Sequence, residues 1–341
     1  MSLTNVMIAG IAGASLGTEI LKCLLLARRY TVFGCDISPF AYGHYHEGFQ
    51  KSFVVKQDSY IDSVLNACIE TNCEFIIPGG EEPSRLLCEA KDRFETHGIR
   101  IAMNSPDLIR TSSDKISCFK SLCDLGFSIP ETREVHGQQD LDDMPFPCII
   151  KPATGSGGSV FVFLARNIHE ASIYVQYLID YGKTPLAQEY ISHDEGEFTI
   201  GVLSLSNGHI ACSIALRRLF NSKLSMLFLT EYGLISSGYS QGIIDNFSEF
   251  RKTAEAIASA FKSTGPLNVQ GRVRNGVFLP FEINPRFSAS TYLRTMAGVN
   301  EVDIYLQHLA HGTAPETPLL RPGFYLRSLT ETFVPRDMVK S

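Results

Sequence analysis

Several features that mark common protein classes are missing from this sequence of 341 residues. It contains no basic run, and its formal net charge is −6, from 30 Lys and Arg against 36 Asp and Glu. This balance argues against a nucleic-acid-binding protein. No stretch of about 18 apolar residues is free of charges, so the sequence predicts no membrane span.

The nine cysteines occur singly, without the spacing of a zinc site or a redox pair. The closest pairs, Cys68 with Cys73 and Cys118 with Cys123, are five residues apart and would lie on different faces of a helix. We therefore expect reduced thiols in a cytoplasmic protein.

The first 104 residues alternate between short apolar strands and helices, which predicts an α/β unit with a parallel sheet. Strands are expected at 5–10, 31–35, 53–55, 74–77 and 99–101. Gly10, Gly13 and Gly17 follow the first strand, but their spacing is not that of the G-x-G-x-x-G dinucleotide fingerprint. Asp36 still lies roughly where the ribose-binding acid of that motif would stand. A tight structural turn is the favoured interpretation, and NAD binding is the alternative.

The strand at 74–77 ends in a glycine-rich, acidic turn, Gly79-Gly80-Glu81, before a helix expected at 82–96. Ligands of open α/β sheets bind at the carboxyl ends of strands, so Glu81 is a candidate substrate-binding residue. Acids in a first helical turn also interact with the helix dipole without any further function, and that is the alternative for Glu81.

A loop rich in glycine and serine separates two apolar strands, one at 146–152 and one at 160–164. Lys151 lies at the end of the first strand, and the loop contains Gly155, Ser156, Gly157 and Gly158. This is not a Walker A loop, because it joins two strands and lacks G-K-[ST]. Backbone N–H groups of a glycine hairpin can bind phosphate, and a plain flexible turn is the alternative.

The stretch from Phe281 to Arg286 has the character of a strand that stops at a proline. Glu282 and Asn284 would project on the same side of this strand. A carboxylate beside an amide oxygen suits Mg²⁺. Arg286 could hold a phosphate or a carboxylate with two parallel hydrogen bonds.

Gln270 can join these residues only in one register of the hairpin that turns at Asn275-Gly276. A plain two-residue turn would place Gln270 opposite Phe281, on the face away from Glu282. If Gln270 belongs to the site, the hairpin cannot keep a plain two-residue turn throughout, and we predict a longer loop or a β-bulge.

Arg217 and Arg218 are expected in a polar loop that follows a strand at 210–216. Such a pair is usually solvated surface, but near an acidic site it could bind a substrate carboxylate.

Taken in order, these motifs resemble the ATP-grasp superfamily, in particular its carbamoyl-phosphate-synthase large-subunit-like branch, which includes amino-acid ligases. The matching pieces are Asp114-Lys115, Ile150-Lys151-Pro152, the loop at 155–159, Glu189-Tyr190-Ile191, Glu197, Gln270 and the stretch from Glu282 to Arg286. The resemblance implies a Rossmann-like α/β unit at 1–104 and a two-subdomain ATP-grasp domain at 105–318. It also implies a lid subdomain at about 130–190 and a C-terminal extension at 319–341.

The resemblance also implies roles for individual residues. Lys115 and Lys151 would contact the phosphates of ATP under a hairpin of Gly155, Ser156, Gly157 and Gly158. Tyr190 and Ile191 would meet adenine, and either Glu189 or Glu197 would hold the ribose. Gln270, Glu282 and Asn284 would bind Mg²⁺ or Mn²⁺, and Arg286 would act with Lys151 on the transferred phosphoryl group. The substrate candidates are Glu81, Arg217, Arg218 and Ser288.

The expected function is an ATP-dependent carboxylate–amine ligase of the acid–amino-acid type. It would use small-molecule substrates, with no nucleic acid or membrane partner, and a homodimer is left open. The sequence carries a single copy of the motif set, whereas carbamoyl phosphate synthesis needs two phosphorylations. The alternatives are a carbamate or carboxylate kinase and an ATP-binding protein without ligase activity.

Overall fold

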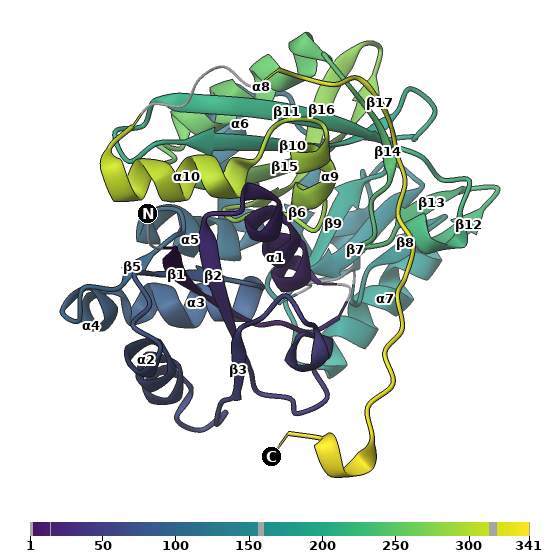
Figure 1. Cartoon of the computed structure of the whole chain (residues 1–341). Coiled ribbons are helices and arrows are strands. Elements are labelled where there is room, and N and C mark those ends of the chain that lie inside the picture. The colour runs from purple at the N-terminus through teal and green to yellow at the C-terminus, as the bar shows by residue number, and fades with distance from the viewer. Residues whose placement is uncertain (1–2, 14, 156–159, 314–318, 341) are drawn as a thin grey trace.

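The computed structural model describes residues 3–13, 15–155, 160–313 and 319–340. Ser156, Gly157 and Gly158 therefore lie outside the described residues. Figure 1 shows three parts: an N-terminal α/β unit, a large antiparallel sheet and a smaller sheet. Within the described ranges, none of the helices has the length and apolar character needed to span a bilayer.

The N-terminal unit is a parallel five-stranded sheet in the order β3-β2-β1-β4-β5, which confirms the alternating pattern. Its strands are β1 (Thr4–Ala9), β2 (Tyr30–Asp36), β3 (Lys51–Val54), β4 (Phe75–Pro78) and β5 (Arg100–Ile101). Its helices are α1 (Leu16–Ala27), α2 (Tyr60–Glu70), α3 (Glu81–Glu89) and α4 (Lys91–Glu95). The prediction of a single helix at 82–96 is wrong, because two helices separated at Ala90 occupy this segment. Residues of β1 pack into apolar clusters on both faces, which explains its unbroken apolar sequence.

The turn after β1 is held by contacts within the protein. The carboxylate of Asp36 accepts the backbone N–H of Ile11 (2.8 Å) and of Ser38 (3.0 Å). A Cβ atom on Gly17 would lie 1.9 Å from the carbonyl oxygen of Gly10, so the turn requires glycine there. These contacts favour the structural interpretation of the turn over NAD binding.

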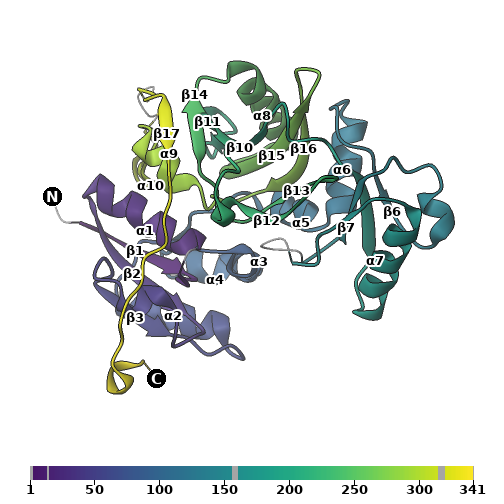
Figure 2. The same ribbon diagram turned by 90° about the vertical axis from the view of Figure 1, so that its right-hand side faces the viewer.

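A smaller sheet occupies the segment expected as the lid. Its order is β6-β9-β7-β8, and α7 packs against β7, β8 and β9. The elements are β6 (Thr132–Glu134), β7 (Cys148–Pro152), β8 (Phe163–Ala165), α7 (Ile168–Asp180) and β9 (Pro185–Glu189), preceded by α5 (Pro106–Ser113) and α6 (Lys115–Asp124). Figure 2 shows this sheet and the N-terminal unit at different sides of the large sheet.

The large sheet has six strands in the order β16-β15-β10-β11-β14-β17. They are β10 (Glu197–Ser204), β11 (Ile210–Arg218), β14 (Gly242–Asp245), β15 (Pro266–Arg274), β16 (Val277–Asn284) and β17 (Gly323–Tyr325). The remaining elements are the hairpin β12 (Met226–Thr230) and β13 (Gly233–Ser236), the helices α8 (Ser248–Ala260), α9 (Thr291–Met296) and α10 (Glu301–His311), and the 3₁₀ turns η1 (Tyr42–Tyr45), η2 (Gln138–Leu141), η4 (Lys223–Ser225) and η5 (Arg336–Met338).

Arg217 and Arg218 belong to β11, so the prediction of a polar loop at these positions was wrong. The strand continues because Arg217 and Arg218 pair with Ile243 and Gly242 of β14, a strand without a strong local signal.

The β15–β16 hairpin contains the predicted bulge. Gln270 pairs with Glu282, whereas the next pair is Gly271 with Pro280, so Phe281 is the extra residue. The turn itself has two residues, Asn275 and Gly276, both with positive φ (53° and 74°) as in a type I′ turn. The bulge therefore brings Gln270 to the same face as Glu282.

We predict that Gly271→Ala destabilises the protein, because Gly271 packs closely at the bulge. A Cβ atom there would lie 2.5 Å from the Phe278 ring and 2.6 Å from the Leu279 carbonyl oxygen. Overpacking of this kind lowers the free energy of unfolding by about 1–3 kcal/mol, which urea titration would measure. Gly238→Ala is the control, because a Cβ atom there meets nothing within 4 Å. Equal stability of the two variants would contradict this account of the hairpin.

Candidate functional site

One face of the large sheet is apolar, and the opposite face is polar where β10, β15 and β16 run side by side. Phe198, Ile200, Val269 and Ile283 pack with α8 in an apolar cluster. The residues that alternate with them along β10, β15 and β16 are polar and face the other way. They include Glu197, Thr199, Asn268, Gln270, Arg272, Glu282 and Asn284, and Arg218 of β11 lies beside Glu197.

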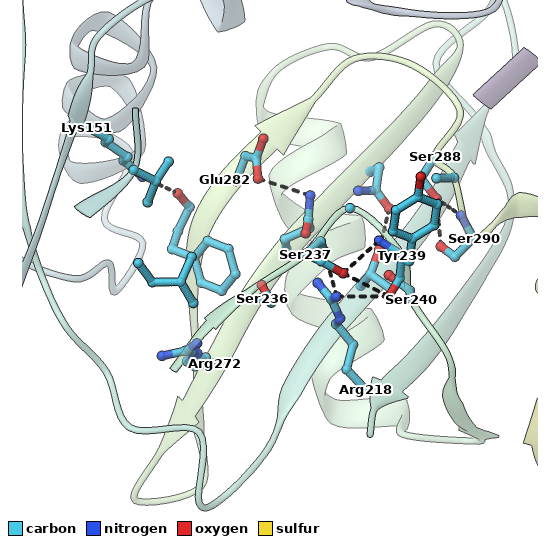
Figure 3. A pocket seen from close by; sticks show the side chains of 18 of the residues that line it. Lys151, Arg218, Ser236, Ser237, Tyr239, Ser240, Arg272, Glu282, Ser288 and Ser290 are labelled. Atoms are coloured by element: carbon cyan, nitrogen blue, oxygen red, sulfur yellow. Dashed lines mark hydrogen bonds between the residues drawn. The ribbon is translucent and has the colours of Figure 1, made fainter. Parts of the chain in front are cut away.

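A cavity of about 550 Å³ lies over this polar face (Figure 3). It is lined by residues from all three parts of the chain. Among them are Glu81, Lys115, Lys151, Glu189, Tyr190, Ile191, Arg218, Gln270, Glu282, Arg286 and Ser288. Most of the residues predicted from the sequence thus meet in one place, although they are spread over some 200 positions.

Lys151 is a buried cation of this cavity, with 6% of its surface exposed. Its Nζ donates to Gln188 Oε1 (2.8 Å) and to the Phe281 carbonyl oxygen (3.1 Å). Burial, and then the charge of Lys115, lower the pKa of Lys151 to about 7, while Glu282 opposes the shift. An anion that entered the cavity would favour the charged form of this amine.

Lys115 lies at the start of α6 beside Lys151. Its backbone N–H donates to the carbonyl oxygen of Ala153 (3.0 Å), two residues beyond Lys151. This bond brings two lysines to one cavity, which is an arrangement suited to a polyanion.

Glu282 and Gln270 lie side by side, since Gln270 Nε2 donates to Glu282 Oε2 (3.1 Å). Asn284 is 8% exposed and is not among the residues that line the cavity. Its Oδ1 accepts from Arg286 Nη2 (3.3 Å), whereas its Nδ2 is buried without a hydrogen-bond partner. Rotation of this amide would offer an oxygen in place of the unpartnered nitrogen.

This donor set fits a hard divalent cation. The described residues contain no cluster of three or more His, Cys, Asp and Glu side chains that could bind a metal. Mg²⁺ is usually held by one or two carboxylates and takes other ligands from water and phosphate, and amide oxygens also suit this metal.

The strand end at 189–191 forms another wall. The Glu189 carboxylate forms an ion pair with Arg274 and accepts the backbone N–H of Glu131 (3.2 Å). Tyr190 Oη accepts the backbone N–H of Leu234 (2.8 Å), and the Ile191 carbonyl accepts Arg272 Nη1 (2.7 Å). These bonds fix the strand end relative to the large sheet.

Glu197 is fully buried and is not among the residues that line the cavity. Its carboxylate accepts Arg272 Nε (2.8 Å) and Arg218 Nη1 (3.1 Å). Burial alone would raise the pKa of Glu197, but the charges of Arg272 and Arg218 outweigh burial and lower this pKa. Of the two acids that the sequence left open, Glu189 reaches the cavity.

The two neighbouring arginines of β11 have different surroundings. Arg218 lines the cavity, and Arg217 does not. Arg218 Nη2 donates to the carbonyl oxygens of Ser225 (3.4 Å), Ser237 (2.7 Å) and Tyr239 (3.4 Å). Figure 3 shows Arg218 beside the loop at 236–240, which itself lines the cavity. Arg218 therefore holds this loop in place.

Several residues of the site were missed from the sequence, including the loop at 236–240 and Arg294. Arg294 is 1% exposed and donates through Nη2 to Asn268 Oδ1 (2.6 Å) and Thr199 Oγ1 (3.0 Å). Asn268 and Thr199 both line the cavity. The two-residue alternation from Gln270 could have identified Asn268, but no local signal marks Arg294 or the loop.

Known proteins resemble this chain in sequence and in fold. Residues 184–332 match the family model described as ATP-grasp in the biosynthetic pathway with Ter operon. The carbamoyl phosphate synthase large chain of Haemophilus ducreyi is 24% identical over 222 residues, covering 62% of this chain and 19% of that relative. The chain spans 19% of the length of this relative and 37% of the length of another curated relative.

Two solved structures share the fold. The L-amino acid ligase from Bacillus licheniformis has a TM-score of 0.68 at 17% identity, covering 94% of this chain and 78% of that one. The N5-carboxyaminoimidazole synthetase from Staphylococcus aureus complexed with ADP has a TM-score of 0.70 at 17% identity, covering 94% and 82%.

We predict that Glu197→Gln is far more destabilising than Glu189→Gln. The first change leaves Arg218 and Arg272 buried without a counter-charge, which costs about 3–5 kcal/mol of unfolding free energy. The Glu189 pair includes the half-exposed Arg274, so its loss costs less than about 1 kcal/mol. Chemical denaturation of both variants measures the difference, and similar losses would contradict the structural role of Glu197.

Proposed function

We propose that the chain is a member of the ATP-grasp superfamily and acts as an ATP-dependent ligase that joins a carboxylate to an amine. The observation that carries this proposal is the position of the buried Lys151 amine beside Glu282 and Gln270 in one cavity. A cation for phosphate and hard oxygens for Mg²⁺ are what a phosphoryl-transfer site needs.

The geometry supports a specific placement of ATP. Its phosphates would lie by Lys115 and Lys151, adenine by Tyr190 and Ile191, and the ribose by Glu189. The Staphylococcus aureus synthetase was solved with ADP in the same fold, which supports nucleotide binding by this chain. Gln270, Glu282 and Asn284 would hold Mg²⁺, or Mn²⁺, which supplies charge neutralisation at the phosphate oxygens.

The proposed reaction has two steps. A carboxylate oxygen of the substrate attacks the γ-phosphorus of ATP, which gives an acyl phosphate and releases ADP. The amine then attacks the acyl carbon, the amide bond forms, and phosphate leaves. Lys151 and Arg286 would stabilise the negative charge that moves onto the transferred phosphoryl oxygens.

The substrates would enter the end of the cavity formed by the N-terminal unit and the loops of the large sheet. Glu81 and Ser288 line this end together with Ser15, Ser240 and Ser290. An amino acid as the amine substrate is the finer proposal, and it is supported by the fold shared with the L-amino acid ligase. Arg218 shapes this end through its loop rather than by a free guanidinium.

The function is tested by offering carboxylates and amines, beginning with pairs of amino acids, and measuring phosphate release from ATP. We expect release only when both substrates are present. Glu282→Ala should lower kcat by about 10²–10³, the usual effect of removing one electrostatic group from such a site. Glu249→Ala, an exposed acid on α8, is the matched control and should leave kcat unchanged. Release with a carboxylate alone would indicate a kinase, and nucleotide binding without turnover would contradict any ligase function.

A second prediction concerns pH, because the pKa of Lys151 lies near 7 before the nucleotide binds. Phosphate favours the protonated amine, so above pH 7 binding must take up a proton. Affinity for the Mg²⁺ complex of AMP-PNP should therefore fall between pH 7 and pH 9, approaching about tenfold per pH unit. Titration calorimetry in buffers of different ionisation enthalpy measures the proton uptake. Lys151→Arg stays charged and should bind with little pH dependence. A flat profile in the unmodified chain would contradict the placement of phosphate at Lys151.

A further inference from the structure

The C-terminal residues connect the large sheet to the N-terminal unit. After β17 the chain, here named the C-terminal strap (residues 326–340), runs past α1 and ends near β3 (Figures 1 and 2). At its far end the Lys340 Nζ donates to the Ser52 carbonyl oxygen (2.7 Å) and to Ser52 Oγ (2.9 Å). The strap is thus anchored at both ends, on β14 through β17 and on the N-terminal unit through Lys340.

Arg327 lies at the start of the strap, and 9% of its side chain is exposed. Its Nη2 donates to Glu19 Oε2 on α1 (2.9 Å) and to the carbonyl oxygen of Ala289. Its backbone N–H donates to Gln241 Oε1 (3.3 Å). One residue therefore contacts three segments that are far apart in the sequence.

Each of these three segments borders the substrate end of the cavity. Ser15 and Leu16, at the start of α1, line the cavity. Ala289 lines it between Ser288 and Ser290. Gln241 directly follows the loop at 236–240, which lines it from the large sheet. The contacts of Arg327 thus lie immediately behind three walls of the cavity.

We propose that Arg327 is a positioning residue that fixes the substrate end of the cavity by joining α1 to the loop at 288–290. The guanidinium group suits this task, since its planar donors can reach a carboxylate and a carbonyl oxygen together. Glu19 is 4% exposed, so the ion pair is shielded from solvent. The effect on substrates rests on the proposed function, whereas the effect on the two segments does not.

Arg327 does not contact the described residues at the nucleotide end of the cavity. Lys115, Lys151 and Glu189 are held by Ala153, Gln188 and Arg274 instead. Loss of Arg327 should therefore act on the two substrates and leave nucleotide binding nearly unchanged.

The test compares the full chain with Arg327→Met, Arg327→Lys and the control Arg336→Met. Arg336 lies on the same strap, is exposed, and forms no side-chain hydrogen bond or ion pair with the described residues. Amide hydrogen exchange is measured without any ligand, and binding of the Mg²⁺ complex of AMP-PNP is measured by calorimetry. The KM of each substrate is then measured for the pair that supports phosphate release.

We expect faster exchange in Arg327→Met at residues 15–20 and 286–291, with AMP-PNP affinity within about twofold of the unmodified chain. The KM of the carboxylate or the amine should rise about tenfold, which corresponds to one charge-assisted hydrogen bond. Arg327→Lys should recover part of this loss through the pair with Glu19, and Arg336→Met should match the unmodified chain.

Unchanged exchange and unchanged KM in Arg327→Met would overturn the proposal. A loss of AMP-PNP affinity as large as the rise in KM would also overturn the proposal, because the effect would then be general rather than confined to the substrate end. If Arg327→Met does not fold, Glu19→Gln weakens the same pair from the other side and is expected to give the same pattern. If no pair of substrates supports turnover, the ligase proposal fails while the exchange result still decides the role of Arg327.

Discussion

The site depends on one irregularity, the bulge at Phe281. Because Phe281 has no partner residue in the β15–β16 ladder, Gln270 comes to face Glu282. The carbonyl oxygen of the same residue accepts the Lys151 amine from the smaller sheet (3.1 Å). A single extra residue thus brings Gln270 and Glu282 to one face of the large sheet and holds the Lys151 amine of the smaller sheet beside them. The bulge belongs to the site rather than being a defect of the hairpin.

The polar face of the large sheet shows how buried charges serve such a site. Glu197, Arg218 and Arg272 form a buried network whose net stabilisation is small, because each charge has lost its hydration. Its effect is on shape: Arg218 holds the loop at 236–240, and Arg272 holds the strand end at Ile191. Arg294 does the same for Asn268. Charges that are paired within the protein therefore determine where the lining residues lie.

The parts of the fold that follow local rules could be predicted from the sequence. The parallel strands of the N-terminal unit and the shared face of Glu282 and Asn284 came from local strand patterns. Gln270 became a candidate through the family resemblance, and two-residue alternation then required a bulge or a longer loop. The continuation of β11 through Arg217 and Arg218 could not be predicted, because it depends on pairing with β14, which lies some 25 residues further along. The same limit applies to Glu189 and Glu197, which the sequence could not distinguish: Glu197 is fully buried beside Arg218 and Arg272, whereas Glu189 lines the cavity. Arg327 has no local signal, since its partners lie on α1 and on the loop after β16.

The central claim is that the cavity between the smaller sheet and the polar face of the large sheet binds the phosphates of ATP. A crystal structure of the full chain with Mg²⁺ and AMP-PNP tests it most directly. We expect the phosphates within hydrogen-bond distance of Lys115 and Lys151, and the metal bound to Glu282 with amide oxygens of Gln270 or Asn284. A nucleotide bound elsewhere, for example at the carboxyl ends of β1 and β2 beside Asp36, would contradict the account.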